Sequence, residues 1–582
     1  MGLTSSLLIG RTALNASQVA LQVTGNNISN VGTEGYHRQR VELSPVRGLH
    51  EGSNLFYGQG VGVDRITRVI DPALAGRLRS SISQEQGASV ERGVLDTIEA
   101  LTNELTGTDL SSQLSKFFNA WSELANNPSS SVTRAAVAEE GSALASYVSN
   151  LRRDFLQQRQ QLEDQLAFSV VRADELVDDI AQLNSAISQA EAGGEAQDGN
   201  LRDQRDLLVD ELAGLIDITV IEQPSGSVDI LVDSQPIVLG NKSKGLKLDR
   251  RSIPGVGSAE GTIEFRVKTD EGDYVRASDG RIGKLLDARD NSVQGLIDDL
   301  DDLSSQLIFQ VNKLHTSGRP TAKLTDTTGW QFVETADQAR AFNDPANETF
   351  AALPFQVNNG SFRVIITDAN GNQYEQNIFV DLDGVQADGT PGFADDTTMA
   401  DIQLALDGIA NLHAEITPGG QLRVYTDAGY DVSFGDDSSG VLAVLGINTF
   451  FQGTTGQDMA MRAEVANDPE LISVGFGPGE NTTALAIAQL REAKVDALGG
   501  RSLTEQWAAA VEGTSVRASA AASRHESLAT VRSSLEAQRA ALSGVSLDEE
   551  SINLITYQQQ YAGAARFISV VDELTQLLIS LV

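Results

Sequence analysis

The strongest hydrophobic pattern lies at the C-terminal end of the chain. From Leu554 to Val582, apolar or small residues recur three or four positions apart, with only Thr575 out of character, which is the spacing of one helix face. A second stripe widens this face beyond the area that one partner helix covers. The first stripe contains Leu554, Tyr557, Tyr561, Ala564, Ile568, Val571, Leu578 and Val582, and the second contains Phe567, Val570, Leu574, Leu577 and Leu581. The pattern therefore predicts a terminal helix with more than one helical neighbour.

A complementary pattern occupies residues 1–31. Large apolar residues lie seven positions apart, with small or apolar residues between them, which predicts a second helical stripe. Two core helices of one domain would have the same periodicity. We favour a coiled coil between the two ends, because both helices are terminal and neither has charges on its apolar face. The N-terminal stripe consists of Leu7, Leu14, Leu21 and Ile28, with Gly10, Ser17, Thr24 and Val31 between them.

Between the termini, the pattern predicts long helices interrupted by two β-rich insertions. Asp71-Pro72 begins a helical region, and residues 132–192 are almost free of Gly and Pro, which predicts a helix of about 90 Å if unbroken. Alternating apolar and polar residues predict strands in a small insertion and again in a turn-rich one, where Asn370-Gly371 predicts a hairpin. Helical patterns return at residues 293–314 and 481–544.

The predicted fold class is multidomain α+β. A terminal α-helical coiled coil continues into a stalk, a long-helix bundle or coiled coil, which carries inserted β-rich outer domains. The predicted division is a terminal domain of residues 1–57 and 541–582, a helical stalk of residues 58–217, 281–319 and 456–540, a small β insertion of residues 218–280, and an outer β-rich domain of residues 320–455.

Composition narrows the function. The 582 residues carry 80 Asp or Glu and 43 Lys or Arg, a formal net charge of -37, which argues against nucleic-acid or anionic-membrane partners. No apolar run approaches the roughly 18 residues of a membrane span, so we expect no membrane insertion. The chain has no cysteine, which excludes disulfides and thiolate metal sites. The N-terminal segment has no early basic region and contains Arg11, so a cleaved secretory signal is not expected.

Candidate chemistry is sparse. The five histidines are scattered and form no two-residue metal pattern. Residues 58–62 are rich in glycine but match no phosphate-binding motif, and the carboxylate pairs of residues 298–302 fall on the polar side of a heptad pattern. The sequence therefore predicts no catalytic residue, no metal site and no cofactor.

Two local motifs go further than the periodicity. Residues 25–43 read GNNISNVGTEGYHRQRVEL, and residues 548–581 read DEESINLITYQQQYAGAARFISVVDELTQLLISL. Both resemble the terminal signatures of bacterial flagellar axial proteins, and the GYHRQ and YQQQYAGAARFIS forms are similar to hook-associated members rather than to rod or hook subunits. Residues 58–74, 201–220 and 444–453 also resemble segments of that group. The first motif rests on Asn26, Asn27, Asn30, Gly35, Tyr36, Arg38 and Gln39.

The resemblance implies a structural, non-enzymatic subunit at the junction between hook and filament. It implies that copies of the chain form a ring, that their terminal helices form an inner tube, and that the chain contacts hook protein and the third hook-associated protein. It also implies secretion by the flagellar type III system, with a chaperone on the C-terminal segment. The expected assembly residues are Leu7, Leu14, Leu21, Ile28, Leu554, Tyr557, Tyr561, Ile568, Val571, Leu574 and Leu578.

Two alternatives remain open at this point. One is another axial subunit of the hook or rod, which the GYHRQ motif and the long heptad patterns disfavour. The other is a junction protein whose outer domain is adhesive or carries an enzyme, because residues 320–436 carry little of the resemblance and an adhesive surface has no short motif.

Overall fold

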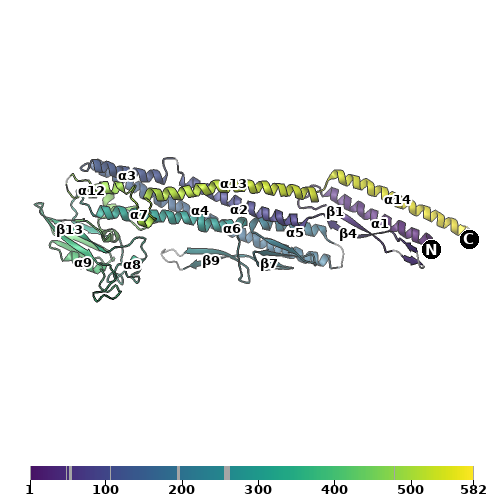
Figure 1. Ribbon diagram of the computed structural model, residues 1–582, viewed down its shortest axis with the longest axis horizontal. Helices are drawn as coiled ribbons and strands as arrows, with labels where there is room; N and C mark the ends of the chain where they lie inside the picture. Colours follow the sequence, from purple (N-terminus) through teal and green to yellow (C-terminus); the bar gives the residue numbers. More distant parts are fainter. Residues whose placement is uncertain are drawn as a thin grey trace.

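The computed structural model describes residues 2–47, 49–51, 55–104, 106–192, 197–253, 262–477 and 479–580. The molecule is elongated, with both termini at one end and a β-rich unit around β13 and α9 at the other (Figure 1). Long helices and separate β-rich parts confirm the predicted mixed α and β architecture. Leu581 and Val582 of the predicted stripes lie outside the described residues. In the described part of the chain, no helix combines the length and apolar character needed to cross a membrane.

The terminal end contains two helices and a β ribbon. Helices α1 (Gly2–Ser29) and α14 (Leu547–Ser580) pack along each other, which confirms the predicted pairing of the two ends. Strands β1 (Gln39–Pro45) and β4 (Val61–Arg68) form an antiparallel ribbon against α1, and β2 (Leu49–Glu51) pairs with β3 (Leu55–Tyr57). Gly60 allows this close approach, since a Cβ there would lie 2.1 Å from Thr12 Oγ1.

The stalk is a bundle of long helices. The Asp71 carboxylate caps its first helix by accepting from the amides of Ala73 and Leu74, at 2.9 and 3.2 Å. The predicted long helix is present and spans 60 residues. The stalk elements are α2 (Pro72–Thr102), α3 (Leu110–Asn126), α4 (Ser131–Ala190), α5 (Gly199–Leu215), α6 (Gly280–Asp287), a π turn (Ala288–Val293), α7 (Gln294–Thr316), α12 (Thr482–Gln489) and α13 (Leu503–Ser543).

The first insertion shares the core of the stalk. Val228, Ile230 and Val232 alternate inward along β6 and belong to the same hydrophobic cluster as the stalk residues Phe117 and Leu176. The strands form two antiparallel sheets, in the orders β5-β6-β7-β8 and β11-β10-β9. Their bounds are β5 (Thr219–Glu222), β6 (Val228–Val232), β7 (Gln235–Leu239), β8 (Lys242–Ser243), β9 (Lys247–Ile253), β10 (Thr262–Lys268) and β11 (Tyr274–Val275).

The second insertion has a hydrophobic core of its own. Its two sheets have the orders β12-β16-β15 and β14-β13-β17. The predicted hairpin is confirmed: Thr367 pairs with Gln373, and Gly371 adopts φ +86° in the turn. The elements are β12 (Asp326–Thr328), α8 (Glu348–Ala351), β13 (Gly360–Thr367), β14 (Gln373–Val380), α9 (Met399–Asp407), β15 (Leu412–Ile416), β16 (Leu422–Thr426), β17 (Asp431–Gly435) and α10 (Val441–Leu445).

The return of the chain to the stalk differs from the predicted continuous helix over residues 481–544. Helix α12 ends at Gln489, and α13 begins only at Leu503, after a short 3-10 turn. Gly499 and Gly500, both at positive φ, close this turn. The returning segment also contains β18 (Phe451–Gln452), β19 (Ala460–Met461), α11 (Ala463–Asn467), a 3-10 turn (Pro469–Leu471) and a second one (Asp496–Leu498).

His315 lies where the second insertion leaves and rejoins the stalk. Its side chain is fully buried; Nδ1 lies 2.8 Å from the Asn448 carbonyl, and Nε2 accepts from the Ser473 amide at 3.1 Å. In the neutral ring, Nδ1–H donates to the Asn448 carbonyl and Nε2 accepts from the Ser473 amide. In a protonated ring, Nε2 would also carry a hydrogen and would face the Ser473 N–H, donor to donor. Burial lowers the pKa of His315 to about 4.

This arrangement predicts a loss of stability in acid. Because the folded pKa lies below the ordinary 6.5, the neutral ring stabilises the fold above about pH 6.5, and this contribution is lost as the pH falls towards 4. A full shift of this size corresponds to a few kcal/mol, on the order of 3. Denaturant unfolding between pH 7 and 4, followed by tryptophan fluorescence, should show a flatter pH dependence for His315→Gln than for the wild type. His413→Gln, at an exposed histidine, is the control, and equal slopes for all three proteins would contradict the assignment.

Candidate functional site

Small residues form the seam between the two terminal helices. Gly10, Ser17 and Thr24 of α1 lie seven residues apart on one helix face and are buried, and Ala16 and Ala20 are buried as well. A Cβ at Gly10 would lie only 2.6 Å from Ile568 Cγ1 of α14, so the approach of the two helices requires glycine there. Small side chains let two helix backbones come closer than leucine pairs allow.

The predicted large apolar residues of α1 lie beside the seam rather than at its centre. Leu7, Leu14, Leu21 and Ile28 are half-buried. The predicted stripe contains both sets, and the small residues are its more deeply buried members. The sevenfold spacing is shared by both sets, so periodicity alone does not choose between them.

The predicted residues of α14 divide into two groups. Val571 is buried, and Leu554, Tyr557 and Ile568 are half-buried on the side that faces the rest of the chain. The others are exposed and remain the expected contacts of further helical neighbours. The exposed fractions are 38% for Tyr561, 49% for Leu574 and 51% for Leu578.

The exposed side of α14 is apolar over several turns. Phe567, Val570, Leu574 and Leu577 follow helical spacing and are each at least 43% exposed, and Ile579 is 72% exposed. An exposed apolar surface of this extent is typical of a protein interaction site. We call Phe567, Val570, Leu574 and Leu577, with Leu578, the open face of α14.

A buried polar hub joins the terminal helices to the ribbon. Asn27 is 1% exposed; its Nδ2 donates to the Gln39 carbonyl at 2.9 Å and to Glu550 Oε2 at 3.2 Å. Its Oδ1 accepts from the Tyr36 hydroxyl at 2.8 Å and from the Gln39 amide at 3.0 Å. Burial and the carboxylates of Asp203 and Glu550 raise the pKa of Tyr36 to about 12, so its hydroxyl keeps the proton that it donates.

The other residues of the first motif shape the turn after α1. Asn30 Nδ2 donates to the Asn26 carbonyl and to Asn26 Oδ1, both at 3.0 Å, which closes the last turn of the helix. Gly35 has φ +75°, a conformation that favours glycine. All seven motif residues thus lie in one structural region.

Arg38 connects this hub to the start of α14. Its side chain donates to Glu550 Oε1 and Glu549 Oε2, both at 2.8 Å, and its backbone amide donates to the Ser543 carbonyl at the end of α13. Glu550 is 2% exposed, so Arg38 supplies the charge that a buried carboxylate requires. The sequence singled out Arg38 but not Glu550, although both stand in the quoted motifs.

A second ionic cluster, which the sequence did not single out, fixes the ribbon to the stalk. Arg68 bonds Asp203 and Asp206 at 2.8 and 2.7 Å, and Arg79 bonds Asp210 at 2.8 Å. Burial works to raise the pKa of Asp206, but the neighbouring guanidinium groups, with Arg68 the strongest, hold it below its ordinary value. Asp203, Asp206 and Asp210 all lie in the LRDQRDLLVDEL stretch at residues 201–212. The closely spaced Arg and Asp residues of this stretch were the sequence feature that could have indicated an ionic cluster.

Among the residues that the structure describes, two groups of side chains lie close enough together to hold a metal ion. In the first, His37, Asp203 and Asp206, the Arg68 guanidinium already occupies both carboxylates. The second, in the outer unit, contains two exposed carboxylates and the buried Asp396, which accepts from Asn343. Exposed acidic groups of this kind are common without an ion, so neither cluster identifies a metal centre.

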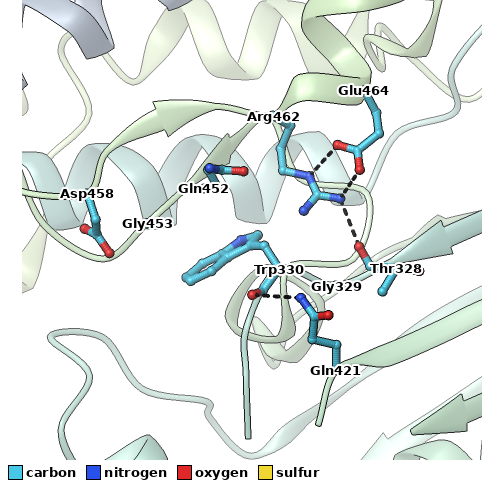
Figure 2. Close-up of a pocket in the computed structure, with 9 residues that line it drawn as sticks. All are labelled: Thr328, Gly329, Trp330, Gln421, Gln452, Gly453, Asp458, Arg462 and Glu464. Atoms are coloured by element: carbon cyan, nitrogen blue, oxygen red, sulfur yellow. Dashed lines mark hydrogen bonds and ion pairs between the residues drawn. The ribbon is translucent and has the colours of Figure 1, made fainter. Parts of the chain in front are cut away.

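A polar pocket lies where the second insertion meets the returning chain. Figure 2 shows Trp330 below Gln452, with Arg462 and Glu464 at the upper right of the pocket. Arg462 donates to the Thr328 carbonyl at 2.9 Å and pairs with Glu464 at 3.2 Å. Asp458 is also engaged, since its carboxylate accepts from two backbone amides of its own loop. The pocket therefore links two passages of the chain and brings no nucleophile and base together.

Comparisons with known proteins agree with the placement of these motifs. A model described as the flagellar hook-associated protein FlgK helical domain matches residues 95–332. A flagella basal body rod protein model matches residues 7–37, and a flagellar basal body rod FlgEFG protein C-terminal model matches residues 537–581. The last two matches cover most of α1 and α14.

Full-length relatives are found in distant bacteria. The chain is 25% identical to flagellar hook-associated protein 1 of Salmonella typhimurium, over 98% of both chains. It is 24% identical to the protein of that name from Bacillus subtilis, over 98% of this chain and 96% of the other. A solved structure of the flagellar hook junction protein FlgK from Burkholderia pseudomallei aligns with a TM-score of 0.48 and 15% identity, covering 80% of this chain and all of that one.

The seam predicts that Gly10→Val will separate the terminal helices. The added side chain collides with Ile568, and overpacking of this kind costs about 1–3 kcal/mol. Amide exchange of residues 547–580 in the purified protein should be faster in this variant. Gly25→Val is the matched control, because no atom lies within 4 Å of a Cβ there. Equal exchange in the two variants would show that α1 and α14 do not meet at Gly10.

Proposed function

Because the chain belongs to the flagellar hook-associated protein 1 family, we propose that it is a structural subunit of the bacterial flagellum at the junction between hook and filament. The observation that carries this proposal is the open face of α14, the helix whose first turn is anchored to Asn27 of α1 through Glu550. Burying one large apolar side chain contributes about 1.5–3 kcal/mol, so covering this face favours assembly strongly. The terminal helices of each copy therefore assemble with those of its neighbours.

The position of the termini supports this arrangement. Both terminal helices lie at one end of the elongated molecule, and the outer unit lies at the other (Figure 1). Terminal helices that line an inner tube leave the outer unit on the periphery, where it does not obstruct assembly. We propose a ring of copies, and identify the seam residues, Tyr561 and the open face with its Leu574 and Leu578 as the assembly surface.

The remaining partners follow from the family. Copies at a hook-filament junction contact hook protein on one side and the third hook-associated protein on the other. The chain is secreted by the flagellar type III system without a cleaved signal, and an export chaperone covers the C-terminal segment beforehand. Covering the open face before export would prevent premature association of copies.

We further propose that the chain is not an enzyme. The pocket of Figure 2 supports this, since the carboxylates and the guanidinium that line it are held by neighbouring groups. The outer unit is a peripheral domain with its own core, and the small β insertion, which shares the stalk core, is part of the stalk rather than an independent domain.

The domain division needs one change at the return of the outer unit. Phe450 packs against Phe117 and Trp121 in the stalk core, and Asn448 holds His315. We therefore place the end of the outer domain at residue 447 instead of 455, with the terminal domain and stalk otherwise divided as the sequence indicated.

The proposed function predicts a location and a phenotype. In a strain that lacks the native gene, the tagged chain should restore filaments, and gold-labelled antibody should mark the boundary between hook and filament in electron micrographs. Leu574→Asp with Leu578→Asp should give a folded, exported protein and cells with hooks but no filaments, because charges on the open face cannot be covered without a large desolvation cost. Label along the hook or at the basal body would overturn the junction role.

The matched control is Gln559→Asp with Gln576→Asp, which adds the same charge to polar, exposed positions of α14. These changes should leave filaments nearly normal. Ile568→Asp is unsuitable for this test because Ile568 packs against Gly10 within one chain.

The domain division predicts that the outer unit is separable. Residues 325–446 are replaced with a short Gly/Ser linker. Phe309→Ser is added because Phe309 stacks on Phe355 and its ring would otherwise be left exposed. This variant should preserve export and filament growth. Replacing residues 325–450 should fail, since it also removes Asn448 and Phe450 from the stalk. Loss of filaments with both replacements, at normal levels of exported protein, would show that the outer unit takes part in assembly.

A further inference from the structure

The first β insertion contains a positive segment in an acidic chain. Residues 242–284 have ten Lys or Arg and seven Asp or Glu, whereas the whole chain has 43 and 80. Five of the ten stand between Lys242 and Arg251, where Asp249 is the single acidic residue. A local reversal of charge sign is a candidate docking surface for an acidic partner.

The outer side of β9 and β10 presents this charge. Residues alternate between the two sides of a strand, so one side of this pair carries two rows of charged residues. Lys247 stands directly opposite Lys268, an unfavourable pairing that Asp270, 3.0 Å from Lys247, and Asp249, paired with Lys268, offset within the chain. Arg251 is exposed and has no ion pair among the described residues. The rows are Lys247, Asp249 and Arg251 on β9, and Lys268, Arg266 and Glu264 on β10, which we call the basic face.

The complementary surface is an acidic ridge on α7, formed by Asp298, Asp299 and Asp302. Asp298 and Asp302 are exposed and lie four residues apart, where like charges destabilise a helix. Neither has an ion pair within the described part of the chain. Partial burial and then the neighbouring carboxylates raise the pKa of Asp302 above its ordinary value. Asp301 is not part of the ridge, because Arg152 binds it at 2.9 Å.

The basic face and the acidic ridge lie at one level of the stalk. Arg289, in the π turn that directly precedes α7, places its guanidinium 4.3 Å over the ring of Phe265 on β10. The sheet therefore lies beside the start of α7, where the ridge begins. Parallel copies standing side by side would bring the two surfaces to the same height.

The two surfaces also lie on different sides of the stalk. Gln506 of α13 donates to Asp299 at 3.4 Å, so the ridge borders α13, whereas β9 packs on α4. Figure 1 shows β9 and α13 along opposite edges of the stalk. A contact between two different surfaces of identical chains is heterologous, and heterologous contacts generate closed rings when the rotation closes.

We propose that the basic face of one copy docks on the acidic ridge of the next copy in the ring, an inference that rests on the proposed junction assembly. The occupant is a second copy of this chain because it is itself strongly acidic and carries the ridge at the matching level. Charged residues on an edge strand also prevent strand-to-strand association within a monomer. That simpler role requires no particular partner for either surface, which makes the two explanations separable by experiment.

A charge exchange tests the contact. In a strain that lacks the native gene, Lys247→Glu with Arg251→Glu should reduce the number of filaments per cell several-fold, and Asp298→Lys with Asp302→Lys should do the same. The fourfold variant, which exchanges both charges, should restore filaments. Arg77→Glu with Arg153→Glu, at exposed positions elsewhere on the stalk, is the control of equal charge change and should have little effect. Normal filaments in both reversed variants, or no restoration by the exchange, would overturn the contact.

Cross-linking provides a second readout that does not depend on the fold of the reversed variants. Since the chain has no cysteine, Arg251→Cys with Asp298→Cys should give dimers and higher multimers when isolated flagella are mildly oxidised, whereas either single variant should not. Filaments without cross-links would contradict the docking contact and leave the proposed function intact. A wild-type chain that never enters the flagellum would instead contradict the proposed function.

Discussion

The close approach of α1 and α14 determines which side of α14 its own chain covers. Because residue 10 is glycine, the backbone of α1 can approach Ile568, and this contact covers one side of α14. The opposite side keeps a row of large apolar residues in solvent, including Leu577 at 60% exposure. A helix that is apolar on more sides than its own chain covers is stable only with further neighbours. The monomer is thus built with an interface that its own fold leaves uncovered.

The polar hub explains how this interface keeps a defined direction. Asn27, Arg38 and Glu550 bind the start of α14 to the ribbon, and Arg68 binds the ribbon to α5. Buried ionic groups add little net stability compared with apolar packing, but they require a specific arrangement of their partners. The hub therefore fixes how the terminal pair leaves the stalk.

The sequence predicted the large elements and the family well, because long helices and paired termini depend on local periodicity and on motifs. It placed Ser17 and Thr24 in one stripe with Leu14 and Leu21 but did not tell which set is more deeply buried, since both share one heptad spacing. The partners of Asp203 and Glu550 were also missed. They lie 135 and 512 residues away along the chain, and separations of that length leave no local pattern. The break between α12 and α13 was visible as Gly499-Gly500 but was outweighed by the helical residues around it.

Thiol accessibility tests the central claim most directly. In a chain without native cysteine, Leu577→Cys places one thiol on the open face, and Thr390→Cys places one on the exposed outer unit. A water-soluble maleimide should label both rapidly in the purified monomer. In isolated flagella, the account predicts that the thiol at position 577 becomes strongly protected while the one at position 390 remains reactive. Equal labelling of position 577 in the monomer and in the flagellum would show that the open face of α14 is not the assembly surface.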